Sequence, residues 1–284
     1  MMSRINRRMC KKNIPLYVLL LCGGVVSILP MIYMISTSLK PNGALYEFPP
    51  HFFPALDKIT VENYIYIFQQ EKFYINFLNS VVVAVLTVIL TAFIAAALAF
   101  CIARFRFPGR NILFGLVIGT MIIPGTTLII TQYQLATFFH LTNKLLGLIP
   151  FYVAWELPFS TFMIKSYIEN IPKDFDEAVY MDGGSTFTVF FKIMLPLASP
   201  AIASVSIFNF LTAWEEFPWA LTVINDNLKR TLPIAISGFF GQHQFTQWGY
   251  VFAMSVASLV PILIIFICFQ KYFVSGLQTG GIKG

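Results

Sequence analysis

The stretch Ile171–Pro200 reads IPKDFDEAVYMDGGSTFTVFFKIMLPLASP, and it is the longest polar interruption in the second half of a very apolar chain. Pro172 suits the first turn of a helix, where the backbone needs no amide donor. The acidic residues behind it, Asp174, Asp176 and Glu177, lie where the positive end of a helix dipole favours negative charge. The pattern predicts a short acidic helix that starts just after Pro172.

A glycine pair marks the end of this predicted helix. Gly183 and Gly184 break the helical pattern, and Ser185 is a residue type that caps the start of a new helix. The second helix is expected to run through Phe187, Phe190 and Phe191, before prolines mark the start of the next apolar run. We therefore expect a helix, a glycine elbow and a second helix, all outside the bilayer and between two spans.

Composition places the whole chain in a membrane. Of its 284 residues, 57% are hydrophobic and only 11% are charged, and its mean hydropathy is +0.73. A soluble domain carries about a quarter of charged residues. The net charge of +6 does not point to nucleic acid, because the basic residues form no shared stripe. We expect an all-α membrane protein with a single transmembrane domain over residues 1–284.

Apolar runs predict six transmembrane helices. The first run is too long for a cleavable signal peptide, so we interpret it as a retained span. A proline interrupts both the third run, at Pro124, and the fourth, at Pro158. A polar loop over 168–196 precedes the fifth span, and an external loop over 221–248 precedes the sixth. The expected spans cover residues 14–39, 76–103, 111–131, 145–167, 197–220 and 249–272.

The basic residues indicate the orientation of these spans. Thirteen lie on the side of the N-terminus, the C-terminus and the 168–196 loop, whereas six lie on the other side. The side richer in Lys and Arg is normally cytoplasmic, so both termini and this loop are expected in the cytoplasm. The thirteen are Arg4, Arg7, Arg8, Lys11, Lys12, Arg104, Arg106, Arg110, Lys165, Lys173, Lys192, Lys271 and Lys283.

The polar loop resembles a known motif. Glu177-Ala178, Asp182-Gly183 and Ile193-x-Leu195-Pro196 are similar to the EAA motif of bacterial binding-protein-dependent ABC importers. In that family, this loop of the permease subunit docks into a cleft of the cytoplasmic ATPase. Its small residues let the helix sit closely in the cleft, and its acids can meet basic ATPase residues. The resemblance to MalG-like carbohydrate permeases extends over nearly the whole chain, through Asn79-Ser80, Arg104–Arg110, Trp214–Ala220, Leu232-Pro233, Trp248 and the tail Gly276–Gly284.

The resemblance implies a fold and a set of partners. The fold is that of a type I ABC importer permease, or MetI-like permease, in a bacterial inner membrane. The implied partners are a second homologous permease, forming a heterodimer, an ABC ATPase dimer that binds ATP and Mg, and an extracytoplasmic solute-binding protein. Residues 225–247 match the loop that enters the binding protein. The tail is expected to contact the ATPase through Gly280, Gly281, Ile282, Lys283 and Gly284.

The chain itself is expected to be non-catalytic. It lacks the G-x-x-x-x-G-K-[ST] loop that binds nucleotide phosphates, and its four cysteines show no metal or redox spacing. We expect no catalytic residue, no cofactor and no metal. The implied role is to form half of the translocation path for an oligosaccharide or related sugar. The sequence does not decide which sugar passes or whether it is acidic.

Four residues are candidates for the translocation path, each with a structural alternative. Glu156, near the middle of the fourth span, either lines the path or hydrogen-bonds to the sister permease. Glu215 and Glu216 either line its outer mouth or are simply solvated. Trp214 either stacks on a sugar or, as we favour for it and for Trp219 and Trp248, anchors the protein at the membrane interface.

Two other classes of protein compete with this interpretation. A stand-alone secondary transporter should carry ionisable residues deep in several spans, and here Glu156 is the one good candidate. No internal repeat of the kind that builds such transporters is visible. A membrane-embedded enzyme should group His, Asp and Glu at one depth, and no such group occurs.

Overall fold

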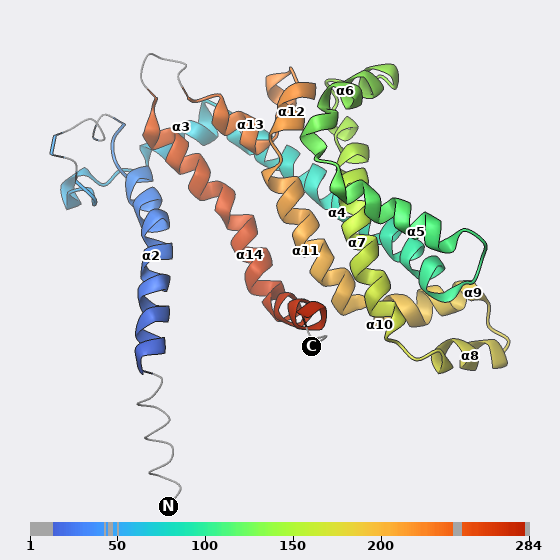
Figure 1. The fold of residues 1–284 in the computed structure, drawn as a ribbon. Coiled ribbons are helices and arrows are strands. Elements are labelled where there is room, and N and C mark those ends of the chain that lie inside the picture. Colours follow the sequence, from blue (N-terminus) through green and yellow to red (C-terminus); the bar gives the residue numbers. More distant parts are fainter. Residues whose placement is uncertain (1–13, 43, 45–47, 50, 241–245, 282–284) are drawn as a thin grey trace, which may run out of the picture. The chain divides into compact units, whose positions relative to one another are not determined.

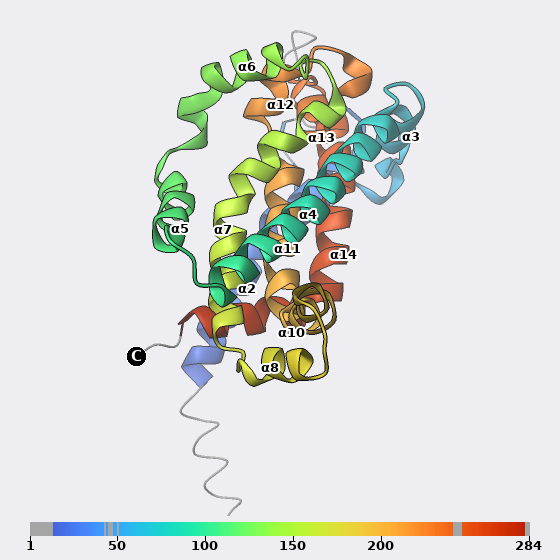
Figure 2. The ribbon, with the colours of Figure 1, turned by 90° about the vertical axis from the view of Figure 1, so that its right-hand side faces the viewer.

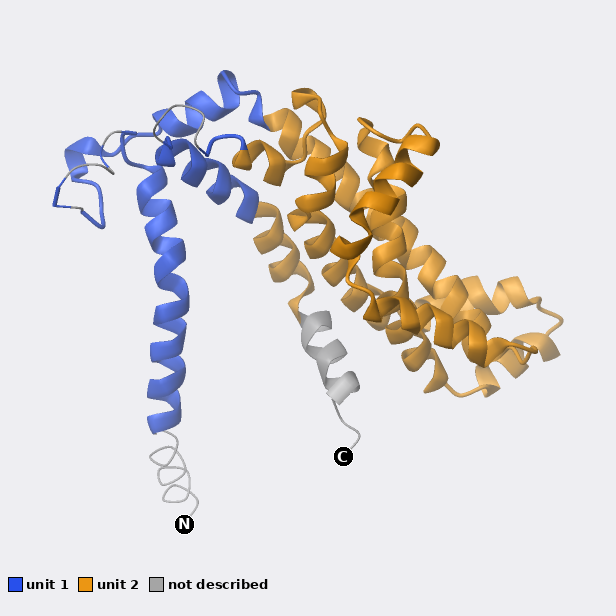
Figure 3. Cartoon of the chain, turned by 45° about the horizontal axis from the view of Figure 1, so that its top comes forward, with its two compact units in different colours: residues 1–73, 238–259 blue, residues 74–237, 260–284 orange. Residues whose placement is uncertain are grey.

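The structure is a computed structural model, which describes residues 14–42, 44, 48–49, 51–240 and 246–281. In these ranges the chain is helical and contains no strand. The predicted all-α fold class is therefore confirmed. The chain divides into two compact units, residues 1–73 with 238–259 and residues 74–237 with 260–284 (Figure 3).

The first unit joins the N-terminal helix to the short segment that follows it. It contains α2 (Ile14–Ser38), η2 (Leu56–Lys58), α3 (Glu62–Gln69) and the first residues of α14 (Trp248–Gly281). The Asn63 side chain of α3 donates hydrogen bonds to the carbonyls of Ser38 and Lys40 at 2.8 and 2.7 Å. Tyr66 stacks on Tyr250 of α14 with ring centroids 4.1 Å apart. These contacts fix the segment after α2 against α14.

The second unit is built on three long helices. They are α4 (Phe73–Arg104), α7 (Ile149–Glu169) and α11 (Ser199–Glu215), and α7 packs along α11. Figures 1 and 2 both show α8 and α10 at one end of this unit and α6 and α12 at the other. Its shorter elements are α5 (Arg110–Gly119), η3 (Thr120–Ile122), η4 (Gly125–Leu128), α6 (Ile129–Phe138), η5 (Leu145–Gly147), α8 (Asp174–Met181), α9 (Thr186–Thr188), η6 (Val189–Met194), α10 (Leu195–Leu197), α12 (Pro218–Val223), η7 (Asn227–Lys229) and α13 (Leu232–Ser237).

Four helices in the described residues are long and apolar enough to span a membrane alone. They cover Pro15–Ser38, Phe73–Arg104, Leu145–Glu169 and Trp248–Gln270. Two further candidates are bent pairs. Arg110–Ile122 and Gly125–Phe138 meet at 91°, and Thr186–Leu197 and Ser199–Glu215 meet at 70°. Counting each bent pair as one span gives six, the predicted number.

The two prolines that interrupt the predicted spans behave differently. The third span bends sharply at Pro124, where the backbone is extended. At Pro158 our expectation of a break was wrong, because α7 continues through this residue without interruption. A proline removes one backbone hydrogen bond, and packing on both sides keeps the helix intact. Pro158 and its neighbour Ser160 are both buried.

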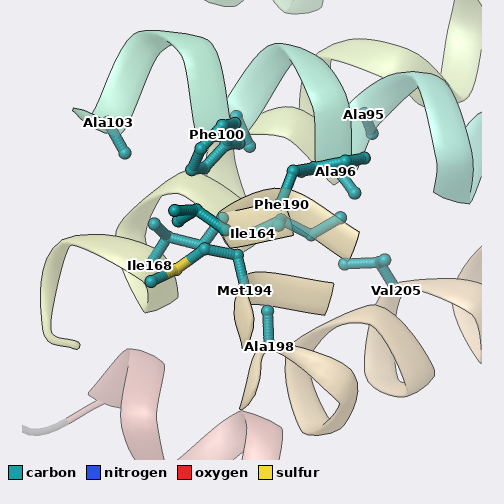
Figure 4. Packing of buried hydrophobic residues seen from close by; sticks show 12 residues of the cluster. Ala95, Ala96, Phe100, Ala103, Ile164, Ile168, Phe190, Met194, Ala198 and Val205 are labelled. Carbon is teal, nitrogen blue, oxygen red and sulfur yellow. The ribbon is translucent and has the colours of Figure 1, made fainter. Parts of the chain in front are cut away.

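A hydrophobic cluster joins three segments at the α8 end of the second unit (Figure 4). α4 contributes small side chains, including Ala95, Ala96 and Ala99, which permit close approach of a neighbouring helix. Into this space pack Phe190 and Met194 from η6, together with Ile164, Ile168, Val189, Ala198 and Val205. The cluster therefore fixes the second helix of the predicted loop to the ends of α4 and α7.

Candidate functional site

The helix, elbow and helix predicted for Ile171–Pro200 are all present. α8 begins at Asp174, with Lys173 as its N-cap and three acids in its first turn. It ends before Gly183, whose φ of +75° is the left-handed conformation that glycine adopts without strain. The Gly183 amide donates to Tyr180 O at 3.1 Å and the Gly184 amide to Val179 O at 2.8 Å. This pair of bonds is a Schellman motif, so the elbow is an ordered helix end.

Gly184 is needed for a different reason. A Cβ at this position would lie 2.5 Å from Val179 Cγ1 and 2.9 Å from the Val179 carbonyl oxygen. The chain therefore passes too close to α8 for any side chain at Gly184. Directly after it, the Ser185 hydroxyl accepts a hydrogen bond from the Thr188 amide at 3.4 Å, which confirms the predicted N-cap.

The second arm of the loop is a helix of mixed type. It begins as α9, widens into the π-helix η6 and closes as α10. The Leu195 amide donates to Phe190 O, five residues earlier, which is the spacing of a π turn. Phe190 and Met194 face the buried cluster, whereas Phe187 is 75% exposed.

Arg104, the last residue of α4, ties α4 to the loop. Its Nε lies 2.9 Å from Asp176 Oδ2 of α8, and both side chains are largely buried. Its terminal nitrogen also donates to the Ile171 carbonyl at 2.9 Å and to Met194 Sδ at 3.7 Å. One guanidinium thus contacts the segment before α8, α8 itself and the second arm.

Two opposing effects act on the ionisation of the Asp176 carboxyl. Burial raises the pKa of the Asp176 carboxyl above its usual value, and the Arg104 guanidinium counteracts this rise. Glu177, directly beside it, adds a further small rise. We had counted Asp176 among the acids available to a partner, and the structure shows it committed to Arg104.

The EAA-like residues separate into two groups. Glu177, Ala178, Asp182 and Gly183 are exposed, and no ion pair within the described residues involves the two acids. Ile193 and Leu195 are half-buried against the hydrophobic cluster, while Pro196 is exposed. The first half of the pattern is therefore on the outer surface of α8, and most of the second half holds the arm in place.

An apolar surface accompanies the exposed acids. The most exposed of its large side chains are Met181, at 87%, and Phe187, and the others are Phe175, Tyr180 and Phe191. Soluble surfaces rarely group such residues without a partner. Asp174, Glu177 and Asp182 are also exposed in this loop, so its exposed side chains are both apolar and acidic.

The predicted path residue Glu156 is buried inside the second unit, with 8% exposure. The Asn209 side-chain amide is assigned with its nitrogen toward the neighbouring acceptors. In this orientation the Asn209 nitrogen donates to Glu156 Oε2 at 2.8 Å, and the Asn209 oxygen accepts from the Ser160 hydroxyl at 3.0 Å. The hydrogen-bond partner of Glu156 is therefore Asn209, on α11 of the same chain.

The Glu216 side chain stabilises the start of a short helix, α12, from one residue before its N-cap, Phe217. Its carboxylate accepts hydrogen bonds from the Trp219 and Ala220 amides of α12, at 2.7 and 3.0 Å, and from the Tyr152 hydroxyl at 2.6 Å. This satisfies amides at the start of α12 that have no partner inside the helix. Glu215, in contrast, is exposed.

Two of the three tryptophans, Trp214 and Trp219, do not lie where we expected them, whereas Trp248 is half-buried. Trp214 is 2% exposed and stacks on Phe210, with ring centroids 5.5 Å apart, and Trp219 is 1% exposed against Phe151. Interfacial anchoring and sugar stacking both need an exposed ring, so neither role fits these two residues. Aromatic partners along the chain bury them in the core of the second unit instead.

A second loop closes the opposite end of this unit. The Asn76 and Asn79 amides of α4 donate to the Arg230 carbonyl, each at 3.0 Å, and Ser80 Oγ accepts from the Leu232 amide at 2.7 Å. The Leu228 amide, aided by Lys229, lowers the pKa of the Asp226 carboxyl. These bonds hold the start of the predicted 225–247 loop against α4. Residues 241–245 of that loop lie outside the described residues.

The predicted ATPase-contacting tail is described only in part. Gly280 and Gly281 form the last backbone turn of α14, while Ile282, Lys283 and Gly284 lie outside the described residues. In the described part of the chain, no group of three or more His, Cys, Asp or Glu side chains could hold a metal ion.

The fold and the site define a multi-pass membrane protein with an exposed acidic helix, α8, in the loop between two long helices. Residues 72–279 match the family described as the binding-protein-dependent transport system inner membrane component, and the chain belongs to this family. It is similar to the trehalose/maltose transport system permease protein MalG of Thermococcus litoralis, with 33% identity covering 96% of this chain and 98% of that protein. It is also similar to the arabinooligosaccharides transport system permease protein AraQ of Bacillus subtilis, with 32% identity covering 92% of each.

A solved structure has the same fold. It belongs to a bacterial ABC transporter involved in the import of the acidic polysaccharide alginate. The TM-score is 0.81 at 21% identity, and the match covers 95% of this chain and 98% of the other. The expected permease fold is confirmed by this likeness.

Proposed function

We propose that this chain is the non-catalytic permease subunit of an ATP-driven importer for an oligosaccharide or related sugar. The observation that carries the proposal is the geometry of residues 171–197, where an exposed acidic helix is fixed to the ends of α4 and α7. A surface that transmits the movement of an ATPase must be accessible on one side and rigidly attached on the other. α8 meets both conditions.

The movement would pass through three attachments. Arg104 joins α8 to α4, the Schellman elbow joins α8 to the second arm, and the hydrophobic cluster joins that arm to α4 and α7. Because packed cores resist small deformations, a displacement of α8 would move these helix ends together. Access to the path would then alternate between the two sides of the membrane as two conformations exchange population.

The proposal includes three kinds of partner. ATP and Mg would be bound by a cytoplasmic ABC ATPase dimer at the α8 surface, and Glu177 and Asp182 are available there for basic ATPase residues. A second, homologous permease would supply the other half of the path. A solute-binding protein would approach the opposite end, where Asn76, Asn79 and Ser80 hold the loop before α13.

The distribution of basic residues supports a cytoplasmic position for α8 and for both termini. The α8 end of the second unit holds Arg104, Arg106, Arg110, Lys165, Lys173 and Lys192, whereas the opposite end holds Lys144, Lys229 and Arg230. Cytoplasmic segments carry the excess of Lys and Arg.

The names of relatives support a sugar as the solute. They include permeases for trehalose and maltose, arabinooligosaccharides and, in Streptomyces coelicolor, diacetylchitobiose. These solutes differ in the sugar units that they contain. The supported class is therefore an oligosaccharide or related sugar, without a choice among them.

Affinity purification of the tagged chain from gently solubilised native membranes tests the proposal. We expect an ABC ATPase, a second permease and a solute-binding protein to co-purify, and we expect the binding protein to bind a sugar. Purification of the chain alone, together with uptake driven by a proton or sodium gradient, would instead identify a secondary transporter.

A further inference from the structure

Two adjoining cavities with basic walls lie where α4 ends and α5 begins. One, of about 430 Å³, is formed by the turn before α5 and its first residues, and the other, of about 310 Å³, lies between the end of α4 and the start of the loop. Arg106 and Arg110 line both cavities. The smaller one is also lined by Ala103, Arg104, Glu169 and Lys173.

The positive charge at these cavities is only partly neutralised. Arg104 pairs with Asp176, and Arg110 approaches Glu169 at 3.4 Å. Glu169 is held more closely by Lys165, at 2.7 Å. Arg106 and Lys173 form no ion pair within the described residues. Arg106 and Lys173 therefore line the cavities without an ion-pair partner among the described residues. Arg110 lines them too, and it shares its partner, Glu169, with Lys165.

An apolar surface continues directly from the basic walls. Ile112 and Leu116 lie one turn apart on α5, with exposures of 69% and 66%, and Phe107 in the preceding turn is 38% exposed. α5 forms part of a bent helix pair that is apolar enough to cross a membrane. Charged groups and apolar side chains thus follow one another over a short distance, as they do at the boundary of a bilayer.

We propose that these cavities bind the phosphate-bearing headgroup of an anionic phospholipid, with an acyl chain along Ile112 and Leu116. Arginine forms paired hydrogen bonds to phosphate oxygens, and Arg106 and Arg110 line both cavities. Lys173 directly precedes α8, so a headgroup in the smaller cavity would contact the base of the loop. The proposal goes beyond the transport function, since it requires no particular solute or ATPase.

Lipid retention tests the proposal directly. The tagged full-length chain, with whatever partners co-purify, is reconstituted in nanodiscs of equal amounts of phosphatidylglycerol and phosphatidylcholine with identical acyl chains. Retained lipid is then counted by mass spectrometry after transfer to detergent. We expect enrichment of phosphatidylglycerol, and we expect Arg106→Gln to lower it about 5-fold, since one basic residue at an anionic surface contributes a factor of that order at low salt.

Further variants separate the site from general charge. Arg106→Gln/Arg110→Gln should remove most of the enrichment, whereas Arg106→Lys should keep much of it. The matched control Lys72→Gln/Lys144→Gln removes two charges from exposed lysines outside the cavities and should leave the enrichment unchanged. Because the Arg106 side chain is exposed and unpaired, its single variant should fold normally even if loss of the Arg110–Glu169 contact disturbs the double variant.

Two results would overturn the inference. One is equal phosphatidylglycerol enrichment in the wild type and in Arg106→Gln/Arg110→Gln. The other is complete displacement of the lipid by inorganic phosphate, which would identify a site for small anions that does not use the apolar surface of α5. Neither result depends on sugar uptake or ATPase binding, so failure here is distinguishable from failure of the proposed function.

Discussion

Arg104 Nε and Asp176 Oδ2 lie 2.9 Å apart, and this buried contact joins the end of α4 to the exposed helix α8. The same guanidinium donates to the Ile171 carbonyl. Arg104 is thus the side chain through which α4 contacts both α8 and the segment leading into it. Because Arg104 is itself buried, it affects the exposed surface of α8 by holding α8 in position.

Replacing Arg104 should damage both stability and coupling. Arg104→Ala leaves the Asp176 carboxylate buried without its partner, which should lower the free energy of unfolding by roughly 3 kcal/mol. We expect uptake to fall at least tenfold in the assembled complex, while Asp176→Asn has a smaller effect on stability. Thermal unfolding and uptake of labelled solute measure the two effects. Lys144→Ala is the control, and equal behaviour of Arg104→Ala and this control would contradict the assignment.

The glycine elbow should respond to side-chain shape. Gly183→Val forces a β-branched residue into a left-handed conformation, at a cost of about 1–2 kcal/mol, whereas Gly183→Asn should be tolerated. Gly184→Val should be at least as harmful, since its Cβ would overlap Val179. We expect normal membrane insertion in all three variants and loss of uptake in the two valine variants. Normal uptake by Gly184→Val would show that the elbow does not set the position of α8.

The exposed apolar residues of the loop should matter for binding and hardly for folding. Met181→Lys and Phe187→Lys change side chains that are mostly exposed, so the free energy of unfolding of the chain should change by less than about 0.5 kcal/mol. Co-purification of the ATPase should nevertheless be lost. Phe138→Lys makes the same kind of change at a residue 76% exposed on α6, at the opposite end of the unit, and should leave ATPase binding intact. Loss of binding in all three variants would indicate a nonspecific effect of charge.

Mutation of Glu215 and mutation of Glu216 should have different effects on the stability of the chain. Glu216→Ala removes the acceptor of two α12 amides and of the Tyr152 hydroxyl, and should destabilise the chain by about 1–2 kcal/mol without changing the KM for uptake. Glu215→Ala should leave stability unchanged. A raised KM with unchanged thermal stability in Glu216→Ala would contradict the capping role and would support a position of Glu216 in the translocation path.

The features predicted correctly from the sequence are those that depend on neighbouring residues. The Gly183–Gly184 elbow and the Ser185 cap are local, because glycine conformations and capping bonds involve residues within one turn. The apolar runs likewise mark long helices by composition alone. The bend at Pro124 was indicated by the proline, but its angle of 91° depends on what packs beside it.

The features missed are contacts between distant segments. The local sequence around Asp176 does not distinguish it from Asp174 or Glu177. Asp176 is buried and the other two are exposed because Arg104 of α4 contacts Asp176 in the folded chain. A basic residue at the end of an apolar run offered a weak signal. Trp214 was similarly misassigned, since aromatic residues near a span end usually occupy the interface, whereas here Phe77 and Phe210 enclose the ring.

The π-helix η6 determines how the segment before it is rotated about the helix axis relative to the hydrophobic cluster. A π turn contains one residue more than an α turn, so the segment before Val189 is rotated relative to the segment after Met194. Deleting one residue here would restore a regular α-helix and turn the preceding segment by roughly 100° about its axis. The rotational setting of α8 could therefore change between related chains through one codon, while the residues of α4, α7 and α11 kept their own spacing.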